Sequence, residues 1–278
     1  INLSPTPPKF TFLDPDNDIY VYNSDLDKWI LGSDLVIAFD IGDYKRLMGL
    51  GKIVKGRVPV LCFDHHPLLN EELYSHIIVD IKSPATGYTF WKYLKEIEYK
   101  DILPIEIAIP LYVSLICDTG SFKYENTTTD THLMAANLIE SGVDSYSIQK
   151  RIYDANSLAH VELLGYVIRN LKFVNGNQVV WAFLDDDILG KYNATSDDLD
   201  GITDYMRAIE GVEVAFLIRK VKDQDIKLNF RSKGTVINDI AGRFDGGGHK
   251  YAAGAYIKNG NVENIKAIIL SELDKKIK

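Results

Sequence analysis

The sequence predicts an α/β protein of two domains, in which a larger domain with a parallel sheet precedes a smaller α+β domain. The chain has 278 residues, 46% of them apolar, so each domain can bury a core of its own. Continuous apolar runs in the first half are typical of strands covered on both faces. Short strand-like segments separated by turn residues fill the second half. We expect domains over 1–155 and 173–278, joined by an amphipathic helix over 156–172.

Two buried strands are predicted in the first domain, over residues 34–40 and 57–64. Both runs are rich in β-branched and apolar side chains and lack the polar alternation of a half-exposed strand. Each run ends in an aspartate, Asp40 in the first and Asp64 in the second. Ligands of open α/β sheets bind at the carboxyl ends of the strands, so both aspartates are candidate site residues.

Two helices are predicted in the same domain, over residues 84–98 and 130–141, from their apolar spacing. The segment 104–117 remains ambiguous. Its length and Pro104 near its start favour a helix, whereas Pro110 would kink or divide one.

The second domain is expected to contain five short strands and two helices. Asn175-Gly176-Asn177 predicts a tight hairpin turn, because Asn and Gly tolerate the left-handed backbone of such turns. The expected strands are 172–174, 178–183, 212–220, 225–231 and 251–256, and the expected helices are 238–244 and 262–277.

Charge and cysteine usage exclude several classes of protein. The net charge is −8 and falls within the first 150 residues, which argues against a protein that coats long nucleic acid. An acidic domain handles phosphates when divalent cations neutralise it locally. Cys62 and Cys117 lack CxxC spacing, which excludes a disulfide scaffold and a cysteine zinc site. No uncharged apolar stretch of about 18 residues occurs, so we expect no membrane segment. The start, Ile1-Asn2-Leu3-Ser4-Pro5, lacks the basic and apolar regions of a signal peptide, and the two thiols fit a reducing compartment, so we expect a cytoplasmic protein.

Asp64-His65-His66, at the end of a predicted buried strand, is the strongest local signal of chemistry. The two imidazoles have three interpretations: structural groups that cap the strand end, a catalytic acid/base pair, or metal ligands beside a group that touches substrate. Asp118 follows a third apolar run, so three runs that end in acidic or histidine residues would converge at one edge. Unpaired carboxylates packed together repel, and a divalent cation removes that conflict. Mixed imidazole and carboxylate ligands favour Mn²⁺.

Gly246-Gly247-Gly248-His249 is the second signal, in the smaller domain. Three glycines permit positive φ angles and close approach to a ligand, and their N–H groups can form an anion-binding nest. Such a run alone is most often only a turn. Arg231 upstream strengthens the ligand interpretation, since a guanidinium contacts phosphate or carboxylate through two donors, although a surface arginine at a strand end is the simpler alternative.

Taken together, these segments resemble the DHH/DHHA1 phosphoesterase family in order and through most of the chain. Relatives of this kind include nanoRNases, 3′-phosphoadenosine-5′-phosphate phosphatases, and phosphodiesterases of linear or cyclic dinucleotides. The segments that carry the resemblance are Phe39-Asp40-Ile41-Gly42-Asp43, Asp64-His65-His66-Pro67, Asp118-Thr119-Gly120-Ser121-Phe122 with Asn126-Thr127-Thr128, Arg231-Ser232, Asn238, and Gly246–His249 with Ala252-Ala253-Gly254-Ala255.

The resemblance implies a role for each matched residue. Asp40 would bridge two Mn²⁺ ions, with Mg²⁺ as the alternative metal, and His65 and Asp118 would bind one of the two ions. His66 would contact the substrate phosphate, and Asp64 would orient the neighbouring metal-bound histidine. The residues implied to bind substrate are Arg231, Ser232, Asn238, Gly246, Gly247, Gly248 and His249.

The family's first motif, a His followed by an Asp-x-Asp pair near the N-terminus, is not found in the chain. Asp14, Asp16 and Asp18 lie only 22–26 residues before Asp40 and no His precedes them, so we interpret them as a turn. We expect that the sequence begins after the first motif. If the native protein began at Ile1, its first metal site would be incomplete.

The expected function is Mn-dependent hydrolysis of short RNA or DNA oligonucleotides, dinucleotides or nucleoside 3′,5′-bisphosphates, in a cleft between the two domains. A homodimer is compatible with this expectation. One alternative is an inorganic pyrophosphatase or exopolyphosphatase, against which Arg231-Ser232 and the glycine run argue. Another is a nucleotide-binding regulatory protein with impaired catalysis, which the missing first motif supports.

Overall fold

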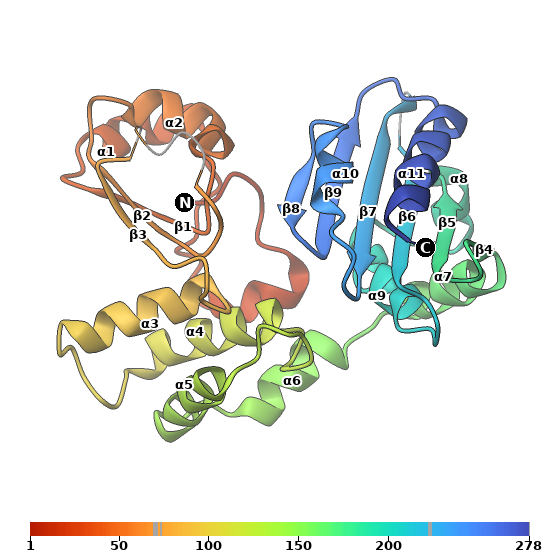
Figure 1. Ribbon diagram of the computed structural model, residues 1–278. Coiled ribbons are helices and arrows are strands. Elements are labelled where there is room, and N and C mark those ends of the chain that lie inside the picture. Colours follow the sequence, from red (N-terminus) through yellow and green to blue (C-terminus); the bar gives the residue numbers. More distant parts are fainter. Residues whose placement is uncertain (69–71, 73, 222–223, 278) are drawn as a thin grey trace. The chain divides into compact units, whose positions relative to one another are not determined.

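Two separate β-sheets organise the protein in its computed structural model, which describes residues 1–68, 72, 74–221 and 224–277 (Figure 1). The chain divides into two units, Ile1–Ala155 and Asn156–Lys278, each with one sheet. The predicted α/β class, with a parallel sheet in the first unit, is confirmed. None of the helices in the described part of the chain has the length and apolarity that a bilayer crossing requires.

The sheet of the first unit has the strand order β1-β2-β3 and is entirely parallel. Strands β1 (Val36–Phe39) and β2 (Val60–Asp64) lie within the two predicted runs. Strand β3 (His76–Val79) was not predicted, because two of its four side chains are exposed and no continuous buried run marks it. Phe39 pairs with Phe63, so the segments after β1 and β2 leave the sheet side by side.

Helices and 3-10 turns make up the rest of the first unit. Helix α4 settles the ambiguous segment: it is continuous through Pro110, and the run before Asp118 is therefore helical and not a strand. The Asp14 side chain accepts a hydrogen bond from the Asp18 N–H (2.7 Å), which confirms the turn expected there. The elements are η1 (Pro8–Leu13), η2 (Ser24–Leu26), α1 (Asp27–Leu31), η3 (Tyr44–Leu47), α2 (Met48–Val54), α3 (Thr86–Glu96), α4 (Ile105–Asp118), α5 (Thr129–Glu140) and α6 (Ser145–Tyr153).

The second unit contains a six-stranded mixed sheet with the order β4-β5-β6-β7-β9-β8. Strands β5 and β6 are parallel, and the other neighbours are antiparallel. The strands are β4 (Lys172–Val174), β5 (Val179–Leu184), β6 (Val214–Lys220), β7 (Ile226–Ser232), β8 (Gly247–His249) and β9 (Ala252–Ile257). The helices are α7 (Leu158–Arg169), α8 (Asp186–Lys191), η5 (Asp197–Leu199), α9 (Ile202–Arg207), α10 (Asn238–Gly242) and α11 (Val262–Lys276).

The two faces of this sheet are covered to different extents. Alternate residues of β6 enter two cores, with Phe216 in one and Leu217 in the other. Strand β7 buries Leu228 and Phe230 in the first core, whereas Lys227 on its other face is exposed. The face of the sheet that carries Leu217 and Lys227 is therefore apolar over β5 and β6 and polar over β7.

Candidate metal centre and substrate surface

The carboxyl edge of the parallel sheet brings two of the predicted aspartates together. Asp64 is the last residue of β2 and is fully buried. Asp40 follows β1 directly, and its N–H donates to the Phe63 carbonyl at 3.0 Å, which extends the ladder by one residue. The Asp40 backbone then enters the left-handed region, with φ +60°, which turns the chain away from the sheet.

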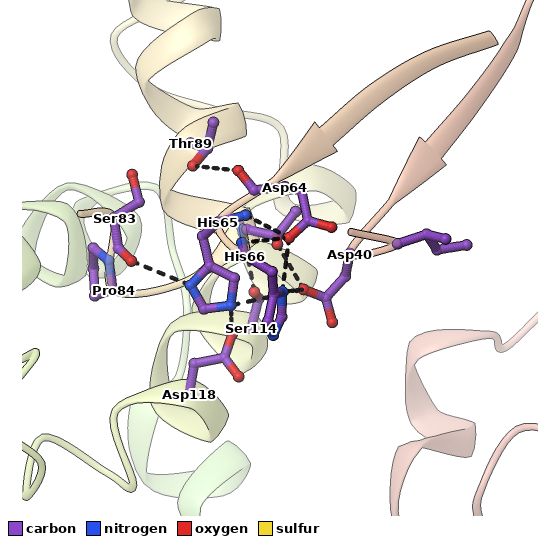
Figure 2. A network of polar contacts seen from close by, with 12 residues as sticks. Asp40, Asp64, His65, His66, Ser83, Pro84, Thr89, Ser114 and Asp118 are labelled. Carbon is purple, nitrogen blue, oxygen red and sulfur yellow. Dashed lines mark hydrogen bonds and ion pairs between the residues drawn. The ribbon is translucent and has the colours of Figure 1, made fainter. Parts of the chain in front are cut away.

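The Asp64 carboxylate holds the segment that carries the two histidines (Figure 2). Its Oδ1 accepts hydrogen bonds from the N–H groups of His65 (2.6 Å) and His66 (2.7 Å). It also accepts one from Nδ1 of the His66 ring at 2.7 Å. Asp64 thus orients the ring of His66, whereas the resemblance implied that it would orient the histidine expected to bind metal.

A backbone carbonyl orients the His65 ring instead. The His65 Nδ1 lies 3.1 Å from the Ser83 oxygen, which can only accept, so Nδ1 carries the proton and the lone pair is on Nε2. Burial lowers the pKa of His65, which keeps the ring neutral. Its Nε2 lies 3.7 Å from Asp40 Oδ1 and 3.9 Å from Asp118 Oδ2.

The two carboxylates beside His65 differ strongly in proton affinity. Burial, together with the nearby charge of Asp40, raises the pKa of Asp118 to about 7. Burial also opposes the ionisation of Asp40, but contacts with His66 and a hydrogen bond from Thr86 outweigh it and lower the pKa of Asp40 to about 2. The ionised form of Asp118, at the end of α4, is therefore disfavoured in this place, and a bound cation would stabilise it.

His66 is a cation in this arrangement. Contacts with Asp40 (3.4 Å from Nδ1) and with Asp64 raise its pKa to about 9. Nδ1 faces the two carboxylates, and in the protonated ring the second nitrogen, Nε2, also carries an N–H. A charged imidazole N–H is a strong donor to a phosphate oxygen.

The donor set at this edge fits a divalent metal ion. Oδ1 of Asp40, Nε2 of His65 and Oδ2 of Asp118 are too far apart to hydrogen-bond, at 3.7 and 3.9 Å from the imidazole. Those separations are below twice a metal–ligand distance of about 2.0–2.2 Å, as two ligands of one ion require. Asp40, Asp64 and His66 also lie close together, but Nδ1 of the charged His66 ring holds a proton there and is not available as a ligand. Sequence reasoning therefore selected side chains that the fold does bring together.

The segment Ser83–Thr86 contacts two of the candidate ligands, His65 and Asp40, and is linked to Asp118 through Asn126; sequence reasoning missed it. Ser83 accepts from His65, and the Thr86 hydroxyl donates to Asp40 Oδ1 at 2.7 Å. The Asn126 side-chain amide donates to the carbonyls of both Pro84 and Asp118, at 3.0 Å each, and so ties this segment to the end of α4. The Ser-Pro-Ala-Thr pattern just before a helix is the signal that marks it.

We expect Thr86→Val to weaken Mn²⁺ binding about 10- to 100-fold, the usual effect of removing a group that orients a metal ligand. Thr86→Ser retains the hydroxyl and should bind within a few-fold of the unmodified protein. Titration calorimetry with Mn²⁺ measures both, with Thr129→Val as a control at an exposed threonine on α5. Equal affinities in the Val and Ser variants would show that the hydrogen bond to Asp40 does not matter.

In the second unit, strand register collects the predicted substrate residues. Arg231 of β7 pairs with Ala252 of β9, which pairs with His249 of β8, so the three lie in one row on one face of the sheet. The last two glycines of the run and His249 form edge strand β8, and neither of the alternatives considered for the run, a simple turn or an anion-binding nest, included a strand. The glycines of the run permit close pairing: a Cβ on Gly246 would lie 2.2 Å from the Gly254 oxygen.

The remaining predicted residues of this unit differ in where they point. Arg231 donates through Nε to Asp204 Oδ2 at 3.1 Å, which fixes the guanidinium. Asn238 donates to the Gly248 carbonyl at 3.5 Å and so links α10 to the glycine run. Ser232 does not join them: its side chain is buried and its hydroxyl donates to Glu213 Oε1 at 3.3 Å. Alternation along β7 places neighbouring side chains on opposite faces, so the Arg231-Ser232 pair cannot act as one unit through its side chains.

A parallel sheet with Asp-His-His at its carboxyl edge, followed by a mixed sheet with a Gly-Gly-Gly-His edge strand, defines a phosphoesterase of the DHH class. A family model described as the DHHA1 domain matches residues 167–278. The chain is 31% identical over 196 residues to the bifunctional oligoribonuclease and PAP phosphatase NrnA of Bacillus subtilis, an alignment that covers 70% of this chain and 61% of that protein. It is 30% identical over 259 residues to NrnA of Thermus thermophilus, covering 91% and 73%.

The chain therefore belongs to the DHH/DHHA1 phosphoesterase family, among its NrnA-like members. It spans about three fifths of the length of the Bacillus subtilis relative. Its fold is similar to that of an exopolyphosphatase-related protein from Bacteroides fragilis, with a TM-score of 0.88, 24% identity, and coverage of 97% of this chain and 80% of that one.

Proposed function

We propose that this protein hydrolyses phosphate esters of short oligonucleotides, dinucleotides or nucleoside 3′,5′-bisphosphates with the help of divalent metal ions, Mn²⁺ first among them. The observation that carries the proposal is the set of donor atoms on Asp40, His65 and Asp118, placed beside a charged His66. The NrnA relatives, named as oligoribonucleases and PAP phosphatases, support the substrate class.

Each residue of the first unit has a task in this proposal. Asp40, His65 and Asp118 hold the metal, which when bound would supply an acidified water and positive charge toward the phosphate. His66 donates its remaining ring N–H to a phosphate oxygen. Asp64 holds that ring in place through the 2.7 Å contact with Nδ1 and keeps it protonated.

We assign the two tasks of catalysis and recognition to different parts of the chain. The predicted DHH domain, residues 1–155, binds metal, and the predicted DHHA1 domain, residues 173–278, binds substrate. Helix α7, predicted as the connector over 156–172, packs Leu163 and Val167 into a core of the second unit. Arg231 and His249 lie in one row of the second sheet and contact the phosphate or base of the substrate away from the bond that breaks. A cytoplasmic location and a homodimer remain predictions.

The experiment that tests the function is a hydrolysis panel with and without Mn²⁺. The substrates are di- to pentanucleotides, a nucleoside 3′,5′-bisphosphate, pyrophosphate and polyphosphate. We expect metal-dependent release of mononucleotides or phosphate from the nucleotide substrates only. Hydrolysis of pyrophosphate or polyphosphate alone would favour the pyrophosphatase alternative. Binding of nucleotides without turnover would favour the regulatory alternative.

Arg231→Ala should weaken binding and turnover of dinucleotides by roughly 1–3 kcal/mol, the cost of losing a charge-assisted hydrogen bond. It should leave hydrolysis of a small chromogenic phosphate diester nearly unchanged, because such a ligand makes no contact with the second sheet. Steady-state kinetics on both substrates provide the measurement. Arg243→Ala, which removes an exposed arginine of the same unit, is the control. A parallel loss on both substrates would show that Arg231 supports the fold and not recognition.

A further inference from the structure

The polar face of the second sheet continues well beyond the row that holds Arg231. On β7 and β9, three successive rows lie on this face, because paired residues in register share a face and alternate residues along a strand return to it. We call these six residues the polar strip: Arg231 with Ala252, Asn229 with Gly254, and Lys227 with Tyr256.

The polar strip has a floor of small residues and larger groups at both ends. Gly254 in the middle row and Ala252 beside Arg231 add little height to the strip on β9, so a ligand can lie along it close to the backbone. Lys227 and Asn229 are exposed, and Tyr256 is 49% exposed despite its size. An exposed aromatic ring beside an exposed ammonium group is the usual composition of a surface that binds single-stranded nucleic acid.

At the far end, the strip opens into a pocket of about 360 Å³ within the second unit. Lys227 and Tyr256 belong to both the strip and the pocket. Arg219, which pairs with Lys227 in register, forms its inner wall and is held by Asp186 (3.1 Å) and Ser196 (2.9 Å). The pocket is lined by Asp186, Ser196, Arg219, Val221, Asp225, Lys227 and Tyr256.

The charges of the pocket leave the Lys227 ammonium as its available cation. Asp225 accepts hydrogen bonds from the Tyr256 hydroxyl (2.5 Å) and from the Asn259 N–H (2.9 Å), and Asp186 is paired with Arg219. Over the described ranges 1–68, 72, 74–221 and 224–277, Lys227 forms no ion pair. A phosphate group at this position would therefore gain a salt bridge without displacing an existing one.

We propose that the polar strip and its pocket bind the nucleotides of an oligonucleotide that extend past the pair held near Arg231. Lys227 contacts a backbone phosphate, and the Tyr256 ring stacks on a base. This inference rests on the proposed function and adds to it a determinant of substrate length. Lys227 and Arg231 are four residues apart on one strand, about 13 Å at 3.3 Å per residue, so a dinucleotide anchored at Arg231 does not reach Lys227.

The test compares kcat/KM for an RNA dimer and an RNA pentamer in the full chain. Lys227→Ala and Tyr256→Leu should each lower the value for the pentamer about tenfold, as expected for a lost phosphate contact or a lost base stack, and leave the value for the dimer unchanged. Tyr256→Phe keeps the ring and should retain the pentamer value. Lys220→Ala removes the same charge from the neighbouring position on β6, whose side chain lies on the opposite face, and should change neither substrate.

Binding of a labelled pentamer, followed by fluorescence anisotropy as salt is varied, gives a second readout that does not depend on turnover. The slope of log affinity against log salt should fall by about one in Lys227→Ala, because one phosphate contact is lost. Equal losses on dimer and pentamer, or no loss on either, would overturn the length determinant. If no oligonucleotide is hydrolysed, the proposed function fails. In that case the binding measurement alone tests the proposal for the polar strip. The proposal is overturned if the pentamer binds no more tightly than the dimer.

Discussion

Replacing Asp40 with asparagine is expected to reduce hydrolysis by more than about 10³-fold, since a metal that stabilises transition-state charge contributes several kcal/mol. Asp40 Oδ1 lies 3.7 Å from His65 Nε2, 3.4 Å from His66 Nδ1 and 2.7 Å from the Thr86 hydroxyl. The substitution removes the anionic oxygen pair around which these groups are arranged. No other described carboxylate contacts both histidine rings as Asp40 does, because Asp64 reaches only the ring of His66.

The measurement pairs turnover of a dinucleotide with calorimetric titration of Mn²⁺. Asp43→Asn is the matched control, because Asp43 lies three residues further along the same loop and caps η3 through the Lys45 N–H at 3.0 Å. That variant should retain metal binding. Full Mn²⁺ affinity and turnover in Asp40→Asn would remove Asp40 from the metal centre.

His65→Ala and His66→Ala should fail for different reasons. His65 presents a neutral ring with its lone pair on Nε2, so its loss should lower metal affinity and activity falls with it. His66 presents a charged ring held by Asp64, so its loss should slow turnover about 10²- to 10³-fold, as for other groups that stabilise developing charge, with metal affinity nearly unchanged.

Manganese titration and single-turnover kinetics separate the two effects. Excess Mn²⁺ should restore part of the activity of His65→Ala but none of the activity of His66→Ala. An exposed histidine of β3, His76, supplies the control substitution. Identical loss of metal from both variants would show that the two rings share one role.

Sequence reasoning reached most of this architecture where a pattern had one physical explanation. The buried runs before Asp40 and Asp64 predicted β1 and β2, because only a covered strand combines such length with such apolarity. The Asn175-Gly176-Asn177 turn predicted the β4–β5 hairpin for the same kind of reason. Because the two strands were expected to end at the same edge of one sheet, Asp40 and Asp64 were expected to lie close together although they are distant in the sequence.

The features that the sequence left open or did not predict depend on tertiary contacts. Residues 105–118 are helical in spite of Pro110, since burial of the apolar side chains outweighs one lost backbone hydrogen bond. The contacts of Ser83 with His65 and of Asn126 with Asp118 join backbone carbonyls to side chains, and no residue pattern encodes a carbonyl as a partner. Ser232 is buried because successive side chains of a strand point to opposite faces of the sheet, and a motif match does not consider this alternation.

Strand β7 carries the interior of its domain and its candidate recognition surface on alternate positions. Leu228 and Phe230 belong to the core, while Lys227, Asn229 and Arg231 face the other way. Inserting or deleting one residue would exchange the two sets, because the side-chain period of a strand is two. This surface can therefore change only through substitutions of individual side chains, which leave the core beneath it intact. A change in the length of the strand would disturb both. Related proteins that differ in ligand preference should accordingly differ here by point substitutions, with gaps confined to the connections on either side.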